Sequence, residues 1–232
     1  MEKLIIEIIR ILLIFSFGSL LGWILEYFYR GMKLNPGFLS GPYLPIYGVA
    51  AVLLNYISGL EMDFISKILV FAFYTTILEF ITGIIFIYYY KLKLWDYSKH
   101  RFNFKGIVCP LYTFYWTILS IFFYYLIYPF ITRIVRGFYA NLELSFFIGI
   151  FYGIFIVDLW QSFKLASRVK NFMDKNRLRA TISLDVLKAK FVSRLNQQGH
   201  KNILIKFFSS PNRLLNNELF SQLSIFLKNR RH

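Results

Sequence analysis

Long apolar runs separated by short polar segments fill the first two thirds of the chain. Each run approaches the roughly 20 residues that an α-helix needs to cross the hydrocarbon core of a bilayer. The pattern therefore predicts an all-α integral membrane protein with about five transmembrane helices. The expected helices cover residues 4–29, 42–60, 65–90, 107–130 and 145–160.

The pattern changes after the last apolar run, where the chain becomes basic and only intermittently apolar. Leucine and phenylalanine recur at helical spacing from Leu184 to Leu195, and leucine again after Pro211, which predicts two amphipathic helices. Basic amphipathic helices bind to the surface of anionic membranes. We therefore divide the chain into a transmembrane domain, residues 1–163, and a basic amphipathic cytoplasmic tail, residues 164–232.

Composition supports a membrane protein, because 57% of the residues are hydrophobic and the mean hydropathy is +0.51. Too few polar side chains remain to cover a soluble domain of 232 residues. A net charge of +15 would suggest nucleic-acid binding in a soluble protein, but here the basic residues lie between and after the apolar runs. There they contact anionic lipid head groups. The lipid bilayer is the expected partner, and nucleic acid is not.

The distribution of positive charge predicts an orientation. If the five helices alternate in direction, 22 of the 27 lysines and arginines lie on one side, with 15 in the tail, 2 in the first loop and 5 in the third loop. The other 5 lie on the opposite side. Because lysine and arginine are concentrated on the cytoplasmic side of membrane proteins, we expect a cytoplasmic C-terminus and an external N-terminus.

Two stretches of the chain share a pattern. Glu26 stands in Ile-Leu-Glu-Tyr and Glu79 in Ile-Leu-Glu-Phe, each in a helix expected to run toward the cytoplasm. A glycine-led return segment follows each of them, Gly41-x-x-x-Pro-Ile-Tyr in the first and Gly106-x-x-x-Pro-Leu-Tyr in the second. This favours a parallel tandem repeat of two helix pairs with one helix added. The two acids match in depth only if the third helix tilts or projects beyond the bilayer, since they lie about one and three turns before the next basic residue.

These segments suggest a candidate site. An ionisable group near the bilayer centre costs at least about 2.5 kcal/mol, and a proline at a helix start leaves backbone groups that need partners. Both costs fall if the two glutamates and the two return segments border one polar cavity; the alternative is that each acid is only a structural hydrogen-bond partner. The candidate residues are Glu26, Arg30, Gly41, Pro45, Tyr47, Glu79, Trp95, Asp96, Asn103, Gly106, Pro110, Tyr112 and Asp158.

Local spacing predicts further contacts. Glu26 and Arg30 are four residues apart, which suits an ion pair on one helix face. Gly18 and Gly22 form a small-x-x-x-small pair that allows a second helix to approach closely. Asp96 precedes Lys99 and Arg101 in a polar loop; a salt-bridge set among them is one interpretation, and solvated side chains are the favoured one.

No catalytic or metal-binding set is evident. The three histidines lie far apart, and the chain lacks an H-E-x-x-H motif. The single cysteine, Cys109, lies in an apolar run and is expected to be buried rather than reactive. We therefore expect no cofactor, no metal and no enzyme activity. A lipid-modifying enzyme built on Glu26, Glu79 or Asp158 is the least favoured alternative, because no nucleophile with a base accompanies them.

A set of short motifs is distributed over residues 11–165. They are Gly22-Trp23 with Glu26, Gly37-Phe38, Gly41-Pro42 with Pro45-Ile46-Tyr47-Gly48, Leu78-Glu79 with Thr82-Gly83, Leu94-Trp95-Asp96-Tyr97-Ser98, Phe102-Asn103 with Gly106, and Asp158. In combination they resemble the bacterial membrane proteins of the Putative ABC-transporter type IV family, which are permease-like. The resemblance implies a multi-span protein of the bacterial inner membrane with a role in transport. It supplies no substrate and no catalytic residues.

The leading functional hypothesis is therefore the membrane component of a transporter. The chain has no G-x-x-x-x-G-K-[ST] motif, so an ATPase that drives transport would be a separate partner chain. The alternative is a non-transporting scaffold or regulatory protein that binds anionic lipid or a partner through its basic tail. Both a monomer and an oligomer fit the sequence.

Overall fold

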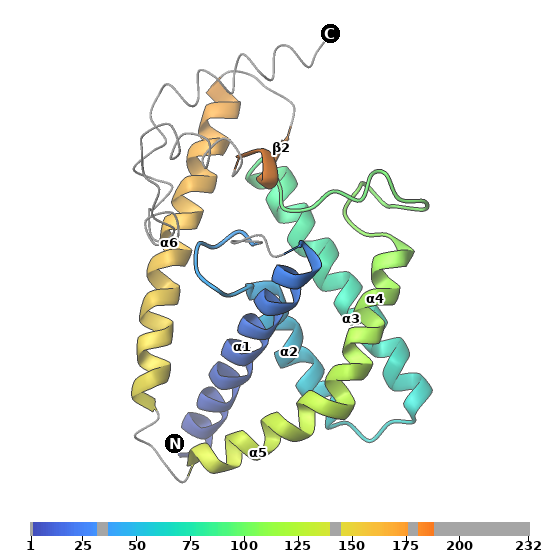
Figure 1. Cartoon of the computed structure of the whole chain (residues 1–232), viewed down its shortest axis with the longest axis vertical. Coiled ribbons are helices and arrows are strands. Elements are labelled where there is room, and N and C mark those ends of the chain that lie inside the picture. The colour runs from blue at the N-terminus through green and yellow to red at the C-terminus, as the bar shows by residue number, and fades with distance from the viewer. Residues whose placement is uncertain (1, 32–36, 140–144, 176–180, 188–232) are drawn as a thin grey trace.

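The computed structural model describes residues 2–31, 37–139, 145–175 and 181–187, and it is built almost entirely of helices (Figure 1). This confirms the predicted all-α membrane class. The helices are α1 (Glu2–Tyr29), α2 (Pro45–Ser58), α3 (Phe64–Ile84), η1 (Ile85–Tyr89), α4 (Pro110–Phe122), η2 (Phe123–Ile127), α5 (Tyr128–Tyr139) and α6 (Ser145–Lys175). Two short strands, β1 (Leu92–Lys93) and β2 (Ile182–Ser183), pair in parallel. The amphipathic helices predicted for the tail lie largely outside the described residues.

Within the part of the chain that the structure describes, four helical segments are long and apolar enough to cross a membrane. They are Glu7–Tyr29, Phe64–Tyr89, Pro110–Ile134 and Phe146–Lys175. The second predicted span differs, because α2 has only 14 residues and is therefore about 21 Å long. Its start is set by Pro45, which follows the irregular segment 37–44 and cannot continue a helix from it. The successive helices α1, α2, α3 and α4 nevertheless run in alternating directions (Figure 1). Helix α6 ends on the side of the molecule opposite to the start of α1.

Helix starts follow simple local rules. Helices α2 and α4 both begin with a proline after an extended residue, Leu44 or Cys109, because proline lacks the N–H that the first helical turn would leave unpaired. Cys109 itself is buried, as expected. Asp63 begins α3 by accepting a hydrogen bond of 2.9 Å from the backbone N–H of Ser66.

Helix α1 packs closely against α2. A side chain at Gly18 would collide with Ala51, and one at Gly22 would collide with the ring of Tyr47. The predicted small-residue contact face is therefore confirmed, and it brings the end of α1 against the start of α2. A buried cluster that includes Ile14, Phe71 and other large apolar side chains of α1, α2, α3 and η2 continues this packing.

Helix α3 has one exposed face and one buried face. The outer face carries Ile65, Leu69 and Phe73, which are 71%, 65% and 61% exposed. The inner face carries Lys67, Phe71, Thr75, Glu79 and Gly83, all buried. Apolar side chains thus point outward and polar ones inward, the arrangement expected when lipid surrounds the helix.

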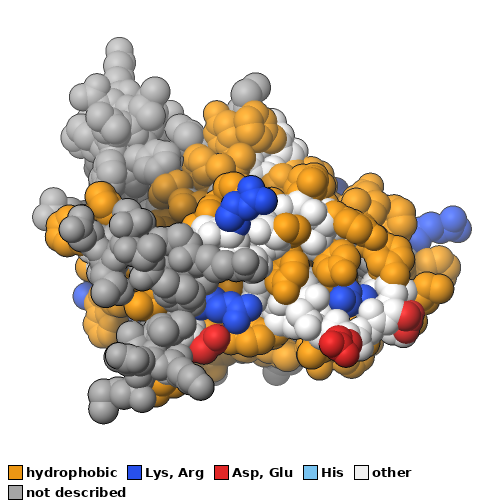
Figure 2. Space-filling model, turned by 90° about the horizontal axis from the view of Figure 1, so that it is seen from below, with side chains coloured by type: hydrophobic (Ala, Val, Ile, Leu, Met, Phe, Trp, Pro, Cys, Tyr) orange, Lys and Arg blue, Asp and Glu red, His pale blue; other side chains and the backbone are white. Residues whose placement is uncertain are grey.

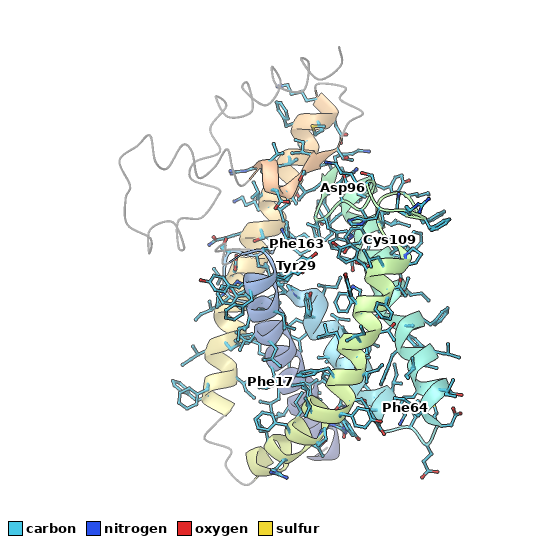
Figure 3. All side chains as sticks on the ribbon, turned by 45° about the vertical axis from the view of Figure 1, so that its right-hand side comes forward. Phe17, Tyr29, Phe64, Asp96, Cys109 and Phe163 are labelled. Carbon is cyan, nitrogen blue, oxygen red and sulfur yellow. The ribbon has the colours of Figure 1, made fainter. Side chains whose placement is uncertain are left out.

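The remaining views agree with this arrangement. Seen from below, hydrophobic side chains cover much of the described surface, with scattered charged side chains among them (Figure 2). Phe17 and Phe64 lie in the lower half of the molecule, whereas Asp96 and Cys109 lie toward the upper end (Figure 3). The boundary drawn at residue 164 falls inside α6, whose later residues pack with η1, β1 and β2 through Val169 and Met173.

Candidate functional site

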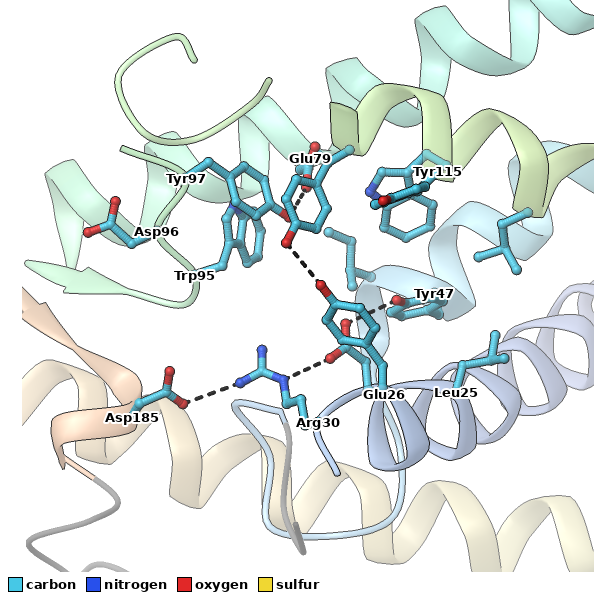
Figure 4. Close-up of a pocket in the computed structure, with 15 residues that line it drawn as sticks. Leu25, Glu26, Arg30, Tyr47, Glu79, Trp95, Asp96, Tyr97, Tyr115 and Asp185 are labelled. Carbon is cyan, nitrogen blue, oxygen red and sulfur yellow. Dashed lines mark hydrogen bonds and ion pairs between the residues drawn. The ribbon is translucent and has the colours of Figure 1, made fainter. Parts of the chain in front are cut away.

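A pocket of about 680 Å³ lies between the upper ends of α1, α2, α3 and α4 and the loop that joins α3 to α4 (Figure 4). Its volume falls within the range of small-molecule sites, roughly 300 to 1,000 Å³. Aromatic and acidic side chains dominate its lining. The lining residues are Leu25, Glu26, Tyr29, Arg30, Ile46, Tyr47, Glu79, Trp95, Asp96, Tyr97, Tyr112, Tyr115, Trp116, Leu119 and Asp185.

One wall of the pocket is formed by the last turns of α1. Arg30 donates a hydrogen bond of 2.8 Å to Glu26, which confirms the predicted i,i+4 pair, and lies 3.3 Å from Asp185. The hydroxyl of Tyr47 donates to the other oxygen of Glu26 at 3.1 Å. Burial alone would lower the pKa of Arg30, but its hydrogen bond to Glu26 and the negative charge of that residue raise it above the usual value. Glu26 and Arg30 therefore form a satisfied ion pair at this wall.

The opposite wall holds Glu79, which is only 2% exposed. Its Oε1 accepts a hydrogen bond of 2.8 Å from the hydroxyl of Tyr97, and the Trp116 indole also lies beside the carboxylate. Oε2 accepts no hydrogen bond from the described residues. Burial, together with the charge of Glu79 and this hydrogen bond, raises the pKa of the Tyr97 hydroxyl far above its usual value. The Tyr97 hydroxyl therefore stays protonated and donates its hydrogen bond to Glu79.

The loop 91–109 brings Tyr97 to Glu79. The backbone N–H of Tyr97 donates to the carbonyl of Gly106 at 2.9 Å, and the Trp95 indole donates to the carbonyl of Ile107 at 2.8 Å. Gly106 has a φ of +69°, which favours glycine, and this lets the loop turn back toward α4. Tyr97 from this loop thereby reaches Glu79, which lies well before the end of η1 at Tyr89.

Stacked aromatic rings form much of the lining. The rings of Tyr97 and Tyr112 stack with their centroids 3.9 Å apart. The ring centroids of Tyr47 and Trp116 are 4.9 Å apart. The hydroxyls of Tyr112 and Tyr29 are 3.0 Å apart and share a hydrogen bond between α4 and α1. The pocket thus combines rigid aromatic surfaces with carboxylates on different walls.

The structure gathers some of the sequence-predicted site residues and separates others. Those that line the pocket are Glu26, Arg30, Tyr47, Glu79, Trp95, Asp96 and Tyr112. Those that lie elsewhere are Gly41, Pro45, Asn103, Gly106, Pro110 and Asp158. Pro45 and Pro110 set the starts of α2 and α4, and Asn103 binds the backbone of its own loop through Ser98, His100 and Gly106. These residues shape the elements around the pocket without lining it.

Asp158 belongs to a different part of the molecule. Its carboxylate accepts hydrogen bonds from the backbone N–H groups of Ser40 and Gly41 and from the hydroxyls of Tyr43 and Ser162. The closest of these is 2.7 Å. Asp158 therefore fastens the irregular segment before α2 to α6, and Gly41 is part of that contact.

Asp96 is placed at the rim of the pocket. The sequence favoured solvated side chains over a salt-bridge set with Lys99 and Arg101, whereas the structure has an ion pair between Asp96 and Lys93 at 3.0 Å. Hydrogen bonds from Ser98 hold the carboxylate on the other side. Burial alone would raise the pKa of Asp96, but the hydrogen bonds from Ser98 and Lys93 lower it below the usual value.

Several lining residues escaped the sequence analysis as site residues. Tyr115, Trp116 and Leu119 follow the predicted Tyr112 at helical spacing on α4, so the sequence held a signal that could have identified them. Tyr97 lay inside a recognised motif but had no assigned role. Asp185 had no usable signal, because it approaches Arg30 from 155 residues away in the sequence.

The chemistry available in the pocket is that of binding. Among the described residues, no group of three histidine, cysteine, aspartate or glutamate side chains is placed to hold a metal ion. The Glu79 carboxyl group, which has no basic partner among the described residues, lines a cavity walled by aromatic rings. Such a site can select a ligand by charge and shape.

Comparison with known proteins gives one family. No curated protein and no solved structure matches the chain. A family model described as Putative ABC-transporter type IV matches residues 13–163, which begin within α1, include α2 to α5 and cover more than half of α6. The chain therefore belongs to the Putative ABC-transporter type IV family and is a transporter-related membrane protein.

Proposed function

We propose that the chain is the permease component of a transporter in the bacterial inner membrane and that a separate ATPase chain drives it. The observation that carries this proposal is the pocket around Glu79. A buried carboxylate with one oxygen unpaired is costly inside an apolar helix bundle. A buried ionisable group in a cavity of small-molecule size is a candidate for a binding site.

The position of the pocket supports a role in passage across the membrane. It lies at the end of α1 that carries Arg30 and beneath the basic loop 91–109. With the C-terminus in the cytoplasm, as the distribution of lysine and arginine favours, the pocket is near the cytoplasmic surface. A permease needs a site that is open to one side at a time, and this pocket would be the inward-facing one.

The orientation can be tested by labelling single cysteines in a Cys109→Ser background. Asp63→Cys and Ser98→Cys lie on opposite sides of the molecule, one before α3 and the other in the loop after it. A membrane-impermeant thiol reagent added to intact cells should label Asp63→Cys, whereas Ser98→Cys should react only after the cells are opened. Labelling of Ser98→Cys in intact cells would reverse the orientation.

The ATPase partner can be tested by mild-detergent purification of the tagged chain from its own membrane at its native level. We expect a protein with a G-x-x-x-x-G-K-[ST] motif to co-purify, and its ATP hydrolysis should change when the chain is reconstituted with it. A tagged multi-span protein of another family is the matched control. If the chain brings down no such ATPase beyond that control, the permease proposal fails and the scaffold alternative gains.

A further inference from the structure

We infer that the pocket recognises an organic ammonium group, with the Glu79 carboxylate as its charge partner and the surrounding rings as its walls. This rests on the proposed transporter function, since it names the class of compound that the permease would bind. The ammonium group could belong to a free amine or to a lipid head group, and both have the same chemistry at the site.

The first step is the charge balance of the pocket. Four acids line it, and three of them have a basic partner. Glu26 and Asp185 share Arg30, and Asp96 pairs with Lys93. Glu79 has no ion pair with any described residue. The four acids are thus matched by only two basic groups, and Glu79 is the acid without an ion pair.

The second step is the unpaired oxygen. Oε2 of Glu79 is buried without a hydrogen-bond partner among the described residues, although the residue lines the cavity. A buried carboxylate oxygen left unpaired is costly. A ligand that carries a positive charge, and that donates a hydrogen bond where it has an N–H, removes this cost. The unpaired oxygen thus favours a cationic ligand.

The third step is the nature of the walls. Tyr97 and Trp116 lie beside Glu79, and Tyr47 and Tyr112 pack against those two rings. Aromatic faces attract cations, and cages of such rings are the usual way in which proteins bind quaternary ammonium groups. A small inorganic cation would instead need several oxygen ligands, and aromatic rings do not supply them.

The fourth step excludes an anion as the principal ligand. Arg30 is the one basic residue that lines the pocket, and Glu26 and Asp185 already occupy it. An anion would therefore meet acids without a free basic group among the described lining residues. Charge complementarity favours a cation.

Binding can be measured on the purified full-length chain in nanodiscs of phosphatidylglycerol, a lipid without an ammonium group. Trp95 and Trp116 line the pocket, so tryptophan fluorescence should report its occupation. The probe is choline. The control ligand is 3,3-dimethylbutan-1-ol, which has the same shape but no charge. We expect choline to change the fluorescence saturably at constant ionic strength, whereas the neutral compound should bind at least tenfold more weakly.

Matched variants tie this binding to the pocket. Glu79→Gln should weaken choline binding by about tenfold to a hundredfold, since a charge-assisted contact is lost. Glu61→Gln makes the same chemical change at an exposed position outside the pocket and should have no effect. Tyr115→Leu removes one half-exposed ring of the lining and should weaken binding about two- to fivefold. The melting temperature of each variant shows whether it is folded, so Tyr115→Leu still tests the site if Glu79→Gln does not fold.

A second set of nanodiscs, with phosphatidylcholine as part of the lipid, separates the two sources of the ammonium group. If the lipid head group occupies the pocket, free choline should bind more weakly there, and the parent spectrum should differ between the two lipids while that of Glu79→Gln does not. If a free amine is the ligand, choline should bind equally well in both.

The inference is overturned if choline acts no more strongly than its neutral analogue and phosphatidylcholine leaves the spectrum unchanged. It is also overturned if Glu79→Gln and Glu61→Gln bind choline equally well. Neither result depends on an ATPase. Loss of the ATPase partner with choline binding retained would therefore remove the permease proposal alone, and the reverse result would remove only the ammonium ligand.

Discussion

Glu79 and Asp158 are both buried acids on long apolar helices, yet their surroundings differ. Asp158 accepts hydrogen bonds from four residues and lies against the segment that it holds. Glu79 lines a cavity and accepts a hydrogen bond from Tyr97 at Oε1, whereas its Oε2 accepts none from the described residues. A buried carboxylate thus stabilises the fold where it accepts a full set of hydrogen bonds. Where it does not, as at Glu79, it is available to bind a ligand.

Removal of the structural acid should have the largest effect on stability. Asp158→Ala leaves two backbone N–H groups and the Tyr43 hydroxyl without their acceptor, and each such loss costs about 1–3 kcal/mol. We expect the free energy of unfolding to fall by about 3 kcal/mol or more. Titration with a denaturing detergent measures this. A loss below about 1 kcal/mol would mean that the segment 37–44 does not depend on this anchor.

The two tyrosines that donate to these acids provide a matched pair. Tyr97→Phe removes the hydroxyl that donates to Glu79 and should cost about 1.5–3 kcal/mol, because the bond is to a charged group with little other support. Tyr43→Phe should cost only about 0.5–1.5 kcal/mol, since Asp158 keeps three other donors. The same unfolding assay compares the two. Equal losses would argue that the two acids are equally well satisfied.

Neutralisation of the pocket acid should change stability less. Glu79→Gln keeps the size of the side chain and removes a buried charge that lacks a basic partner, so the free energy of unfolding should change by less than about 1 kcal/mol or rise. Thermal unfolding in the absence of ligand tests this against Asp158→Asn, which should be clearly destabilised. A loss for Glu79→Gln as large as that for Asp158→Asn would place both acids in the structural class.

The rim acid should show the smallest effect. Asp96 is exposed, and its pair with Lys93 should contribute under about 1 kcal/mol. The pKa of Asp96 is lower in the folded chain, so its contribution is present above the unfolded pKa and is lost as the pH falls through the folded pKa. The stability of the parent should therefore fall slightly more than that of Asp96→Asn below about pH 4. If the stability of the two proteins has the same pH dependence, Asp96 makes no such contribution.

Much of the helical framework could be predicted from the sequence, because apolar runs of spanning length leave little choice in a membrane. The α1–α2 contact was also visible, since two glycines four residues apart allow close approach. The length of α2 was not, because Pro45 and the irregular segment before it compete with the apolar run that follows. The helical turns η1 and η2 were likewise missed, since packing rather than local composition sets them.

The candidate site was predictable only in part. The cost of a glutamate in an apolar helix identified Glu26 and Glu79 without any structure. The same reasoning included Asp158, and it could not separate a satisfied acid from an unsatisfied one. That difference depends on hydrogen bonds from residues more than 110 positions away in the sequence, such as Ser40 and Gly41. The aromatic lining was predicted in part, through Tyr47, Trp95 and Tyr112. Tyr97 was missed for a related reason, because the fold of the loop 91–109 brings it over α4.

The stabilisation of three proteins by choline is the most direct test of the distinction between these two acids. A ligand that binds the folded state raises the melting temperature according to its concentration and affinity. Choline should raise the melting temperature of the parent and of Asp158→Asn, although the latter starts lower, and should leave Glu79→Gln unchanged. Equal shifts in all three proteins, or a shift retained in Glu79→Gln and lost in Asp158→Asn, would contradict the assignment of Glu79 as the ligand-binding acid.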